Sequence, residues 1–245
     1  MTEQGSPGRS RTGGVRERAR AAVMADLLDI AAAHLADQGA ADLSLRAIAR
    51  ELGMASSAVY RYVSSRDELL TLLILRAYNT VGEVAEKAHA DTVAGGGDPA
   101  ACWLAVARAI RHWAKAAPHE YALIYGSPVR GYQAPQETVA AAVRLWMVIV
   151  RILKDAVLGG TLRPPAHPFQ VDGLMSEEVT ALAEGFREPP FEDVVVRSLA
   201  LFASLFGAIS AELFGHFVGF GSDEERVFDL TVATAAVGVG LDLPV

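Results

Sequence analysis

Cysteine is almost absent from this chain of 245 residues, which contains only Cys102. A single cysteine excludes an internal disulfide and fits a reducing compartment, and no signal peptide is visible, so we expect a cytoplasmic protein. The chain also has no HExxH motif, no clustered Cys/His ligand set and no G-x-S-x-G turn. We therefore expect no metal, no cofactor and no enzyme activity.

Strand patterns and long membrane-spanning runs are also missing. No alternation of apolar and polar residues persists, whereas Ala, Leu, Arg and Glu, which favour helices, are abundant. The apolar run before Glu212 is about 14 residues long, short of the roughly 20 that a bilayer requires. We predict an all-α fold with no membrane partner, and a hydrophobic content of 51% is ample for a core.

Lysine is missing from the first 76 residues, although the chain as a whole is acidic, with a net charge of −7. Residues 1–76 hold ten Arg and nine Asp or Glu, so the acidic excess belongs to the remainder. Five of these Arg lie in or near an N-terminal tail whose polar, Gly-rich composition predicts disorder over residues 1–14. Two interpretations of the Arg stay open: an arm that enters the minor groove of DNA, or a solubilising tail.

The stretch 44–70 has the pattern of two short helices joined by a tight turn. Ser44 is placed to cap the first helix, and Gly53 is placed to end it. Ser56 or Ser57 is expected to cap the second. The apolar residues of the first helix recur at i, i+3, i+4 and i+7: Leu45, Ile48, Ala49 and Leu52. The pattern predicts a helix-turn-helix whose second helix enters the major groove of DNA.

Longer helices are predicted on both sides of this motif. One runs from about Val15 to Asp37, and another begins near Arg66. We expect a three-helix DNA-binding domain over residues 15–65 and a larger helical domain over residues 66–245. Further helices of the larger domain are predicted at about 99–117, 118–126, 135–158, 175–186, 191–218 and 223–239.

The polar residues of the motif are suited to contact DNA. Hydroxyls and guanidinium groups donate to phosphate oxygens and base edges, and large exposed aromatics are not needed for solubility. The predicted DNA contacts are Ser44, Arg46, Ala55, Ser56, Ser57, Tyr60, Arg61, Tyr62 and Arg66. Ser57 and Arg61 are the candidates for base readout, and Arg66 starts a helix whose dipole favours a phosphate.

The pattern S-L-R-x-I-A-x-E-L-G-x-x-x-x-A-V-Y-R-Y-V-x-x-R-D-E-L-L resembles the DNA-binding domain of TetR-family transcriptional regulators. The resemblance implies an all-helical homodimer with an N-terminal DNA-binding domain and a C-terminal ligand-binding and dimerisation domain. By position, Tyr60 and Tyr62 match the family's phosphate-contacting pair, and Arg66 matches its usual Lys. Val63 departs from the usual Phe but remains apolar. The segment EYALIYGSPVRGYQAP, residues 120–135, resembles one C-terminal subfamily common among actinobacterial TetR-type regulators.

Aromatic residues make up only 7% of the chain, yet all three Trp and three of the six Tyr lie within residues 103–146. Aromatic side chains with polar tips suit a pocket for a mid-sized, largely apolar ligand. The candidate ligand contacts are Trp103, His112, Trp113, Tyr121, Tyr125 and Trp146. Core packing is the alternative for each of them, and the family resemblance favours a small lipophilic or aromatic effector.

The last two predicted helices carry a candidate dimer interface. Apolar residues in the first repeat at alternating spacings of three and four, as in a coiled coil, and the second offers a weaker stripe. The predicted interface residues are Leu199, Phe202, Phe206, Ile209, Leu213 and Leu230. A neighbouring strip of small residues would allow close approach of helices: Ala200, Ala203, Gly207 and Ser210. Packing within one subunit is the alternative.

Together these features predict a ligand-responsive transcriptional regulator. We expect a repressor that binds a palindromic operator in double-stranded DNA as a homodimer and is released by a small molecule. One alternative is a constitutive architectural DNA-binding protein without ligand response. The least favoured alternative is an enzyme that uses the aromatic and histidine residues of segment 103–146.

Overall fold

The computed structural model describes residues 11–163, 177, 191–219 and 221–243. In this part of the chain the regular structure is helical, apart from one isolated bridge between Leu162 and Leu241. The predicted all-α fold is therefore confirmed. The helix predicted at 175–186 and the first ten residues of the predicted disordered tail lie outside the described residues, except for Glu177.

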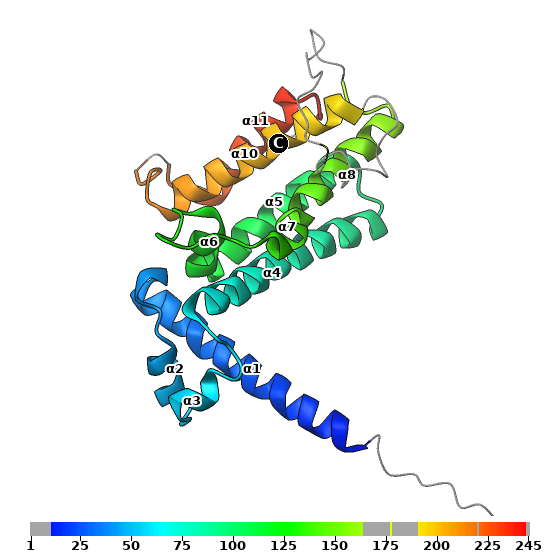
Figure 1. The fold of residues 1–245 in the computed structure, drawn as a ribbon. Coiled ribbons are helices and arrows are strands. Elements are labelled where there is room, and N and C mark those ends of the chain that lie inside the picture. The colour runs from blue at the N-terminus through cyan, green and yellow to red at the C-terminus, as the bar shows by residue number, and fades with distance from the viewer. Residues whose placement is uncertain (1–10, 164–176, 178–190, 220, 244–245) are drawn as a thin grey trace, which may run out of the picture.

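The N-terminal domain, called the head below, contains α1 (Arg11–Gln38), η1 (Ala40–Asp42), α2 (Leu45–Glu51) and α3 (Ser56–Val59). Figure 1 shows it at one end of the molecule, joined to the rest by α4 (Arg66–Ala94). The head core consists of buried apolar residues from these helices and from the start of α4: Leu27, Ala31, Leu43, Leu45, Ile48, Ala49, Val59, Val63, Leu69, Leu70 and Leu73. This small core fixes α3 relative to α1 and α4.

The local signals of the motif mostly hold, with two corrections. The Ser44 hydroxyl caps α2 by accepting from the Ala47 N–H, and Gly53 ends the turn with a φ of 66°. However, Ser56 and Ser57 do not cap α3, because Ala55 has the extended backbone of the N-cap and Ser56 is already helical. Also, α1 begins at Arg11, so residues 11–14, predicted to be disordered, are helical.

The larger domain, called the body, consists of α4 and the helices that follow it. These are α5 (Pro99–Ala116), α6 (Pro118–Tyr125), η2 (Gln136–Thr138), α7 (Val139–Ala142), α8 (Arg144–Leu158), α10 (Phe191–Leu213) and α11 (Glu224–Gly238). The single helix predicted at 135–158 is divided into η2, α7 and α8. The break between α7 and α8 is slight, since Val143 keeps helical backbone angles and its N–H still donates to Val139.

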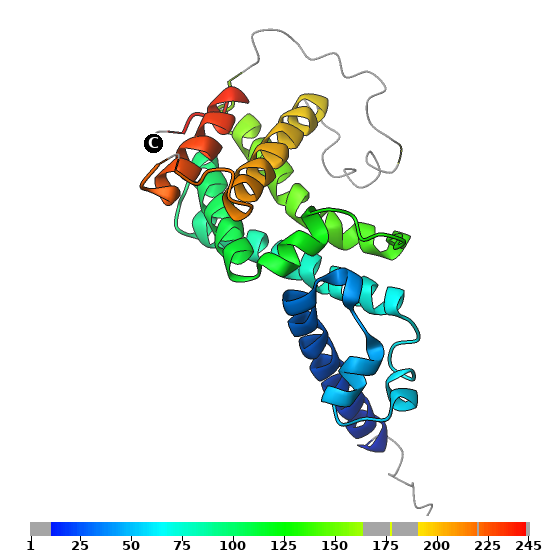
Figure 2. The ribbon, with the colours of Figure 1, turned by 90° about the vertical axis from the view of Figure 1, so that its left-hand side faces the viewer.

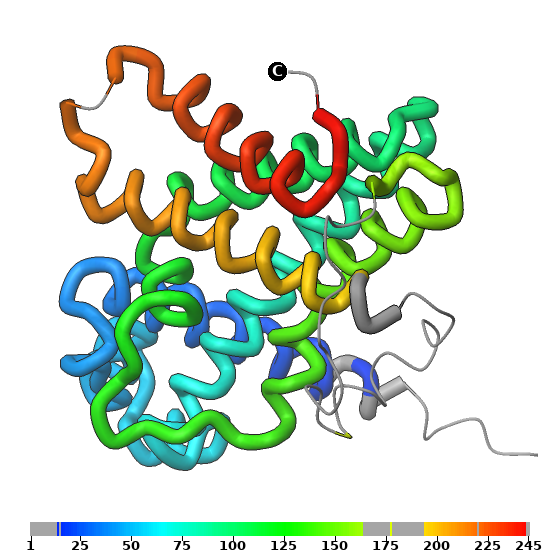
Figure 3. The backbone as a smooth tube through the Cα atoms, turned by 90° about the horizontal axis from the view of Figure 1, so that it is seen from above, coloured from blue at the N-terminus to red at the C-terminus, as the bar shows by residue number. Residues whose placement is uncertain are grey.

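The body helices stack in layers against one core. Helix α4 packs mainly on α5 and α8, and α10 lies against α8 and α11. Figure 2 shows the body from the side, and Figure 3 shows α10 and α11 running side by side across the top. Asp98 caps α5 through the Ala101 N–H, with Pro99 in the first turn, as the sequence predicts.

The apolar part of α10 is longer than the roughly 14 residues that the sequence indicated. Val194–Leu213 has a mean hydropathy of 1.9 and is long enough to cross a membrane. Length and composition alone do not separate a membrane span from the core helix of a folded domain. In this structure the helix carries polar groups with partners in the same chain: Arg197 Nη1 donates to the Val239 carbonyl at 2.6 Å, and Glu212 pairs with Arg111. Both contacts fit a helix of the body core.

Candidate nucleic-acid interface and effector region

Polar contacts join α1 to α2 of the head and to α4 of the body. His34 Nε2 lies 2.8 Å from Glu51 Oε2, which ties α1 to α2. The Arg76 guanidinium donates to Asp29 at 2.6 Å, which ties α4 to α1. Helix α3 is held in place by the apolar core, through Val59.

One exposed face of the head gathers most of the predicted DNA contacts. Ala55, Ser56, Ser57, Tyr60 and Arg61 are exposed along α3 and the turn after it, and Tyr60 retains 47% of its accessible surface. Arg46 is exposed on α2. A short helix presenting hydroxyls, a phenol and a guanidinium together can contact phosphates and base edges at once.

Three other predicted contacts also have structural partners, of which the sequence revealed only the cap at Ser44. Ser44 is half-buried and caps α2. Tyr62 packs against the head core, and the Arg20 guanidinium lies 5.2 Å from its ring centre. Arg66 donates to the carbonyl oxygens of Ala40 and Ala41, at 2.6 and 3.2 Å. A guanidinium has five N–H donors, so Arg66 keeps donors for a phosphate.

Aromatic rings from four helices meet between α6 and α10. This aromatic cluster consists of Tyr78, Trp113, Tyr121, Tyr125, Phe202 and Phe206. The ring centres of Tyr125 and Phe206 are 3.8 Å apart, and those of Tyr121 and Tyr125 are 5.4 Å apart. Burial raises the pKa of the Tyr121 and Tyr125 hydroxyls, so both stay neutral at ordinary pH.

Two polar atoms of the aromatic cluster are buried with no hydrogen-bond partner among the residues that the structure describes: Trp113 Nε1 and the Tyr125 hydroxyl. By contrast, the Tyr121 hydroxyl is satisfied by Ser210 Oγ at 2.7 Å and by the Phe206 carbonyl at 3.1 Å. A buried polar group without a partner costs about 1–3 kcal/mol, and such groups are rare in folded proteins. The aromatic cluster therefore has unused hydrogen-bonding capacity.

The remaining predicted ligand contacts lie elsewhere. Trp103 is fully buried, and its Nε1 donates to the Val232 carbonyl at 3.0 Å. Trp146 donates to Ser198 Oγ at 2.9 Å, and His112 is exposed on α5. The structure thus brings together Trp113, Tyr121 and Tyr125 but not Trp103, His112 or Trp146. Sequence reasoning did not place Tyr78, Phe202 or Phe206 in this group, since their contacts join distant segments.

Helix α6 has the aromatic cluster on one side and the head on the other. Leu123 of α6, with Val129 and Tyr132 of the following loop, packs against the head core. The Tyr132 and Thr71 hydroxyls are 2.9 Å apart, and Tyr78 donates to the Ile124 carbonyl at 3.4 Å. The body therefore contacts the head through α6 and its loop as well as through α4.

The predicted dimer residues divide into two groups. Leu199 and Leu230 are 48% and 45% exposed. Phe202, Phe206, Ile209 and Leu213 instead pack on the body core, and Ile209 is only 1% exposed. Their burial has a simple cause: the large side chains of α10 pack within their own subunit, which is the alternative that the sequence left open. The small-residue strip faces outward, with Ala200, Ala203 and Gly207 exposed.

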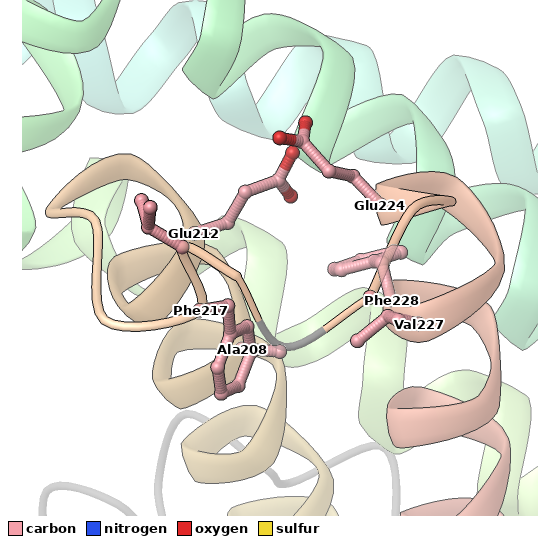
Figure 4. Close-up of a pocket in the computed structure, with 8 residues that line it drawn as sticks. Ala208, Glu212, Phe217, Glu224, Val227 and Phe228 are labelled. Atoms are coloured by element: carbon pink, nitrogen blue, oxygen red, sulfur yellow. The ribbon is translucent and has the colours of Figure 1, made fainter.

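A hollow lies where the end of α10 approaches the start of α11 (Figure 4). Its walls include Ala208, Phe217 and Phe228, with the carboxylates of Glu212 and Glu224 at one side. The carboxylates have partners on α5, which lower the pKa of Glu212 although burial alone would raise it. Those partners are Arg111, at 2.7 Å from Glu212, and Lys115, at 2.6 Å from Glu212 and 3.1 Å from Glu224. These contacts clamp α5 to α10 and α11.

Two family models match the chain. The model described as "Bacterial regulatory proteins, tetR family" matches residues 27–73, and the model "Tetracyclin repressor-like, C-terminal domain" matches residues 103–235. The first match covers the helix-turn-helix, and the second covers α10, most of α11 and the aromatic cluster except Tyr78.

Relatives with names and solved structures agree with these matches. An HTH-type transcriptional regulator of Mycobacterium tuberculosis is 42% identical over 218 residues, covering 88% of this chain and 92% of the relative. The crystal structure of the regulatory protein SCO4313 aligns with a TM-score of 0.68 at 33% identity, over 89% of this chain and 97% of that one. PfmR, a TetR family regulator from Thermus thermophilus, shares the fold at 18% identity, with a TM-score of 0.57 over 85% of this chain and 96% of that chain.

Proposed function

We propose a function for this chain from one premise: it belongs to the TetR family, and is a transcriptional regulator with a DNA-binding helix-turn-helix. We infer that it acts as a repressor in the cytoplasm, that a homodimer binds a palindromic operator, and that a small effector releases it. The observation that carries this proposal is the position of α6 between the aromatic cluster and the head core.

Operator binding is assigned to the exposed face of α3 and the turn after it. Tyr60 would contact phosphates, and Ser57 and Arg61 would read base edges in the major groove. The exposure of these three side chains supports the assignment. Tyr62 and Arg66 would assist, since each also holds a part of the head in place.

Dimerisation is assigned to the outward faces of α10 and α11. Exposed apolar and small residues line them: Leu199, Ala200, Ala203, Gly207, Phe214, Leu230, Val237 and Gly238. Such a face allows close approach of a symmetry-related copy, because small residues let helix backbones come together. Two-fold symmetry in the protein is then mirrored by a palindromic operator.

Effector binding is assigned to the aromatic cluster. A lipophilic or aromatic molecule would replace ring contacts, and an acceptor atom on it would satisfy Trp113 Nε1 or the Tyr125 hydroxyl. Because Tyr125 belongs to α6, an effector that separates Tyr125 from Phe206 would move α6 against the head core. The effector must prefer this displaced conformation, since equal affinity for both states would change nothing.

The test is a selection from random duplex DNA, with Tyr60→Ala in parallel, followed by a thermal-shift screen of lipophilic compounds. We expect an enriched palindrome that Tyr60→Ala no longer selects, and a compound that both raises the melting temperature and releases the DNA. DNA binding without any stabilising compound would favour the constitutive architectural protein. No enriched sequence at low salt would contradict the operator assignment and leave the aromatic segment to be tested for an enzyme.

A further inference from the structure

We propose that the first turns of α1 form a second DNA-contacting element beside α3. These turns, residues 14–22, are called the overhang below, and their ligand would be the phosphate backbone next to the α3 site. The proposal rests on the operator-binding function of the head but concerns a different element. The helix-turn-helix family match begins only at residue 27 and does not include the overhang.

The overhang lies outside the apolar core of the head, although Arg20 contacts the head at Arg61 and Tyr62. Among the apolar side chains of α1 that the structure describes, Met24 is the first that packs against the head core, and the described side chains from Arg16 to Ala22 are all exposed. Figures 1 and 2 show the start of α1 extending past α2 and α3, at the end of the head away from the body.

The overhang is strongly basic. Residues 14–22 contain three basic residues, Arg16, Arg18 and Arg20, and one acidic residue, Glu17. The apolar residues described there are Ala19, Ala21 and Ala22, too small to form a hydrophobic docking face. Duplex DNA offers the complementary partner, because it carries one negative charge for about every 1.7 Å of its length. The charge of the overhang therefore favours binding to a polyanion rather than to an apolar protein surface.

The geometry connects the overhang to the α3 face. The Arg20 guanidinium lies over the Tyr62 ring, and its Nη2 donates to the Arg61 carbonyl at 3.5 Å. Arg16 is four residues earlier, so it lies on the same face of α1, about 6 Å farther along the axis. Arg20 thus lies next to Arg61 at the end of the α3 face, and Arg16 lies beyond Arg20 on the same side of α1.

Arg16 has the properties of an unused phosphate ligand. Its side chain is exposed, and within the described part of the chain it makes no hydrogen bond or ion pair. Arg18 differs, since its Nε donates to the Gly14 carbonyl of the same helix at 3.0 Å. Arg16 can therefore be replaced without loss of a contact in the head, which makes it the residue to test.

The experiment compares four proteins: the unchanged chain, Arg16→Ala, Arg16→Lys and Arg151→Ala. The affinity of each for the selected operator is measured between 50 and 200 mM salt. Arg151 is exposed on α8 in the body, so its variant removes the same charge far from α3. One lost phosphate contact lowers the slope of log affinity against log salt by about 0.9, and Arg16→Ala removes one contact from each subunit of the proposed homodimer, so its slope should fall by about 1.8 and its binding should weaken roughly 25- to 100-fold near 0.1 M salt.

We expect this loss in Arg16→Ala, recovery of the slope in Arg16→Lys, and no change in Arg151→Ala. Hydroxyl-radical footprints of Arg16→Ala should lose protection at phosphates beside those that Tyr60→Ala exposes. An unchanged slope and footprint in Arg16→Ala, with normal operator binding by the unchanged chain, would overturn the overhang proposal alone. Equal weakening in Arg151→Ala would also overturn it, because net charge would then explain the effect. Failure of the unchanged chain to bind any duplex would remove the proposed function itself.

Discussion

The hydroxyl groups of Tyr132 and Thr71 lie 2.9 Å apart and join the loop after α6 directly to α4. Thr71 is buried beside the head core, and the Tyr132 ring packs on the same core. The contact spans 61 positions in the sequence. A displacement of α6 would therefore reach the head by a route that does not pass along the length of α4.

Removal of this hydrogen bond should weaken the effector response more than DNA binding. Tyr132→Phe keeps the ring on the head core but loses the hydroxyl, at a cost of about 0.5–1.5 kcal/mol in the free energy of unfolding. We expect operator affinity within about twofold of the unchanged chain, and a higher effector concentration for half-release of DNA. Effector titrations of the operator complex measure this. Thr71→Val is the reciprocal variant, and an unchanged release curve in both would show that the contact plays no part in the response.

Removal of the hydroxyl group should change the free energy of unfolding in opposite directions at two tyrosines of the aromatic cluster. Tyr125→Phe removes a buried hydroxyl without a partner, so we expect the free energy of unfolding to rise by about 1 kcal/mol. Tyr121→Phe breaks hydrogen bonds to Ser210 and to the Phe206 carbonyl, so we expect a decrease of about 1 kcal/mol. Denaturant unfolding of both variants without effector measures the pair. Destabilisation by Tyr125→Phe would mean that its hydroxyl already has a partner in solution.

A charge on the outward face of α11 should separate the subunits without unfolding them. Leu230→Glu places a carboxylate at a position that is 45% exposed in one subunit and is proposed to be covered in the dimer. We expect a monomer in sedimentation velocity, with helical content retained and operator binding lost. Leu158→Glu is the control, because Leu158 is 69% exposed on α8, away from the proposed interface. Dimers of normal affinity in Leu230→Glu would exclude this face.

Ile209 gives the complementary prediction, since it lies in the core of its own subunit. Ile209→Ala should lower the free energy of unfolding by about 2–5 kcal/mol, the usual cost of a large-to-small change in a core. We expect no additional, concentration-dependent loss beyond this. Thermal unfolding at several protein concentrations separates the two effects. A loss of stability that grows on dilution would show that Ile209 contributes to the dimer interface.

The charge clamp on α5 predicts how stability depends on pH. Hydrogen bonds from Arg111 and Lys115 hold the pKa of Glu212 below its ordinary value of 4.5. A carboxylate with a lowered pKa in the folded state stabilises the fold above its unfolded pKa, and this contribution disappears as pH falls through the folded pKa. Glu212→Gln should therefore lower stability at pH 7 by about 2 kcal/mol and have a smaller effect in acid.

Denaturant unfolding from pH 7 to pH 3 tests this dependence. Glu83→Gln serves as the control, because the Glu83 side chain is 72% exposed and its oxygen is 3.9 Å from Arg144. We expect little effect of that variant at either pH. A Glu212→Gln curve parallel to that of the unchanged chain would show that the clamp does not hold the ionised form.

Local chemistry explains which parts of the fold the sequence predicted. The Ser44 cap, the Gly53 turn and the Asp98–Pro99 start of α5 depend on neighbouring residues, and all three are present in the structure. The start of α3 was displaced by one residue, because the cap depends on the backbone conformation of Ala55 rather than on the presence of a hydroxyl. Short-range signals of this kind are reliable for element type and less so for boundaries.

The sequence by itself determined that this protein is all-helical, that it carries a helix-turn-helix, and that its family is TetR, because periodicity, caps and a contiguous motif are local properties. Tertiary structure decided which face of α10 fills the core, which aromatic residues meet, and that Tyr132 reaches Thr71. The apolar stripe of α10 did not reveal its partner, since burial within a subunit and burial between subunits have the same driving force. Only the packing of α10 on α8 and α11 distinguishes them, by covering Ile209 and leaving Leu199 exposed.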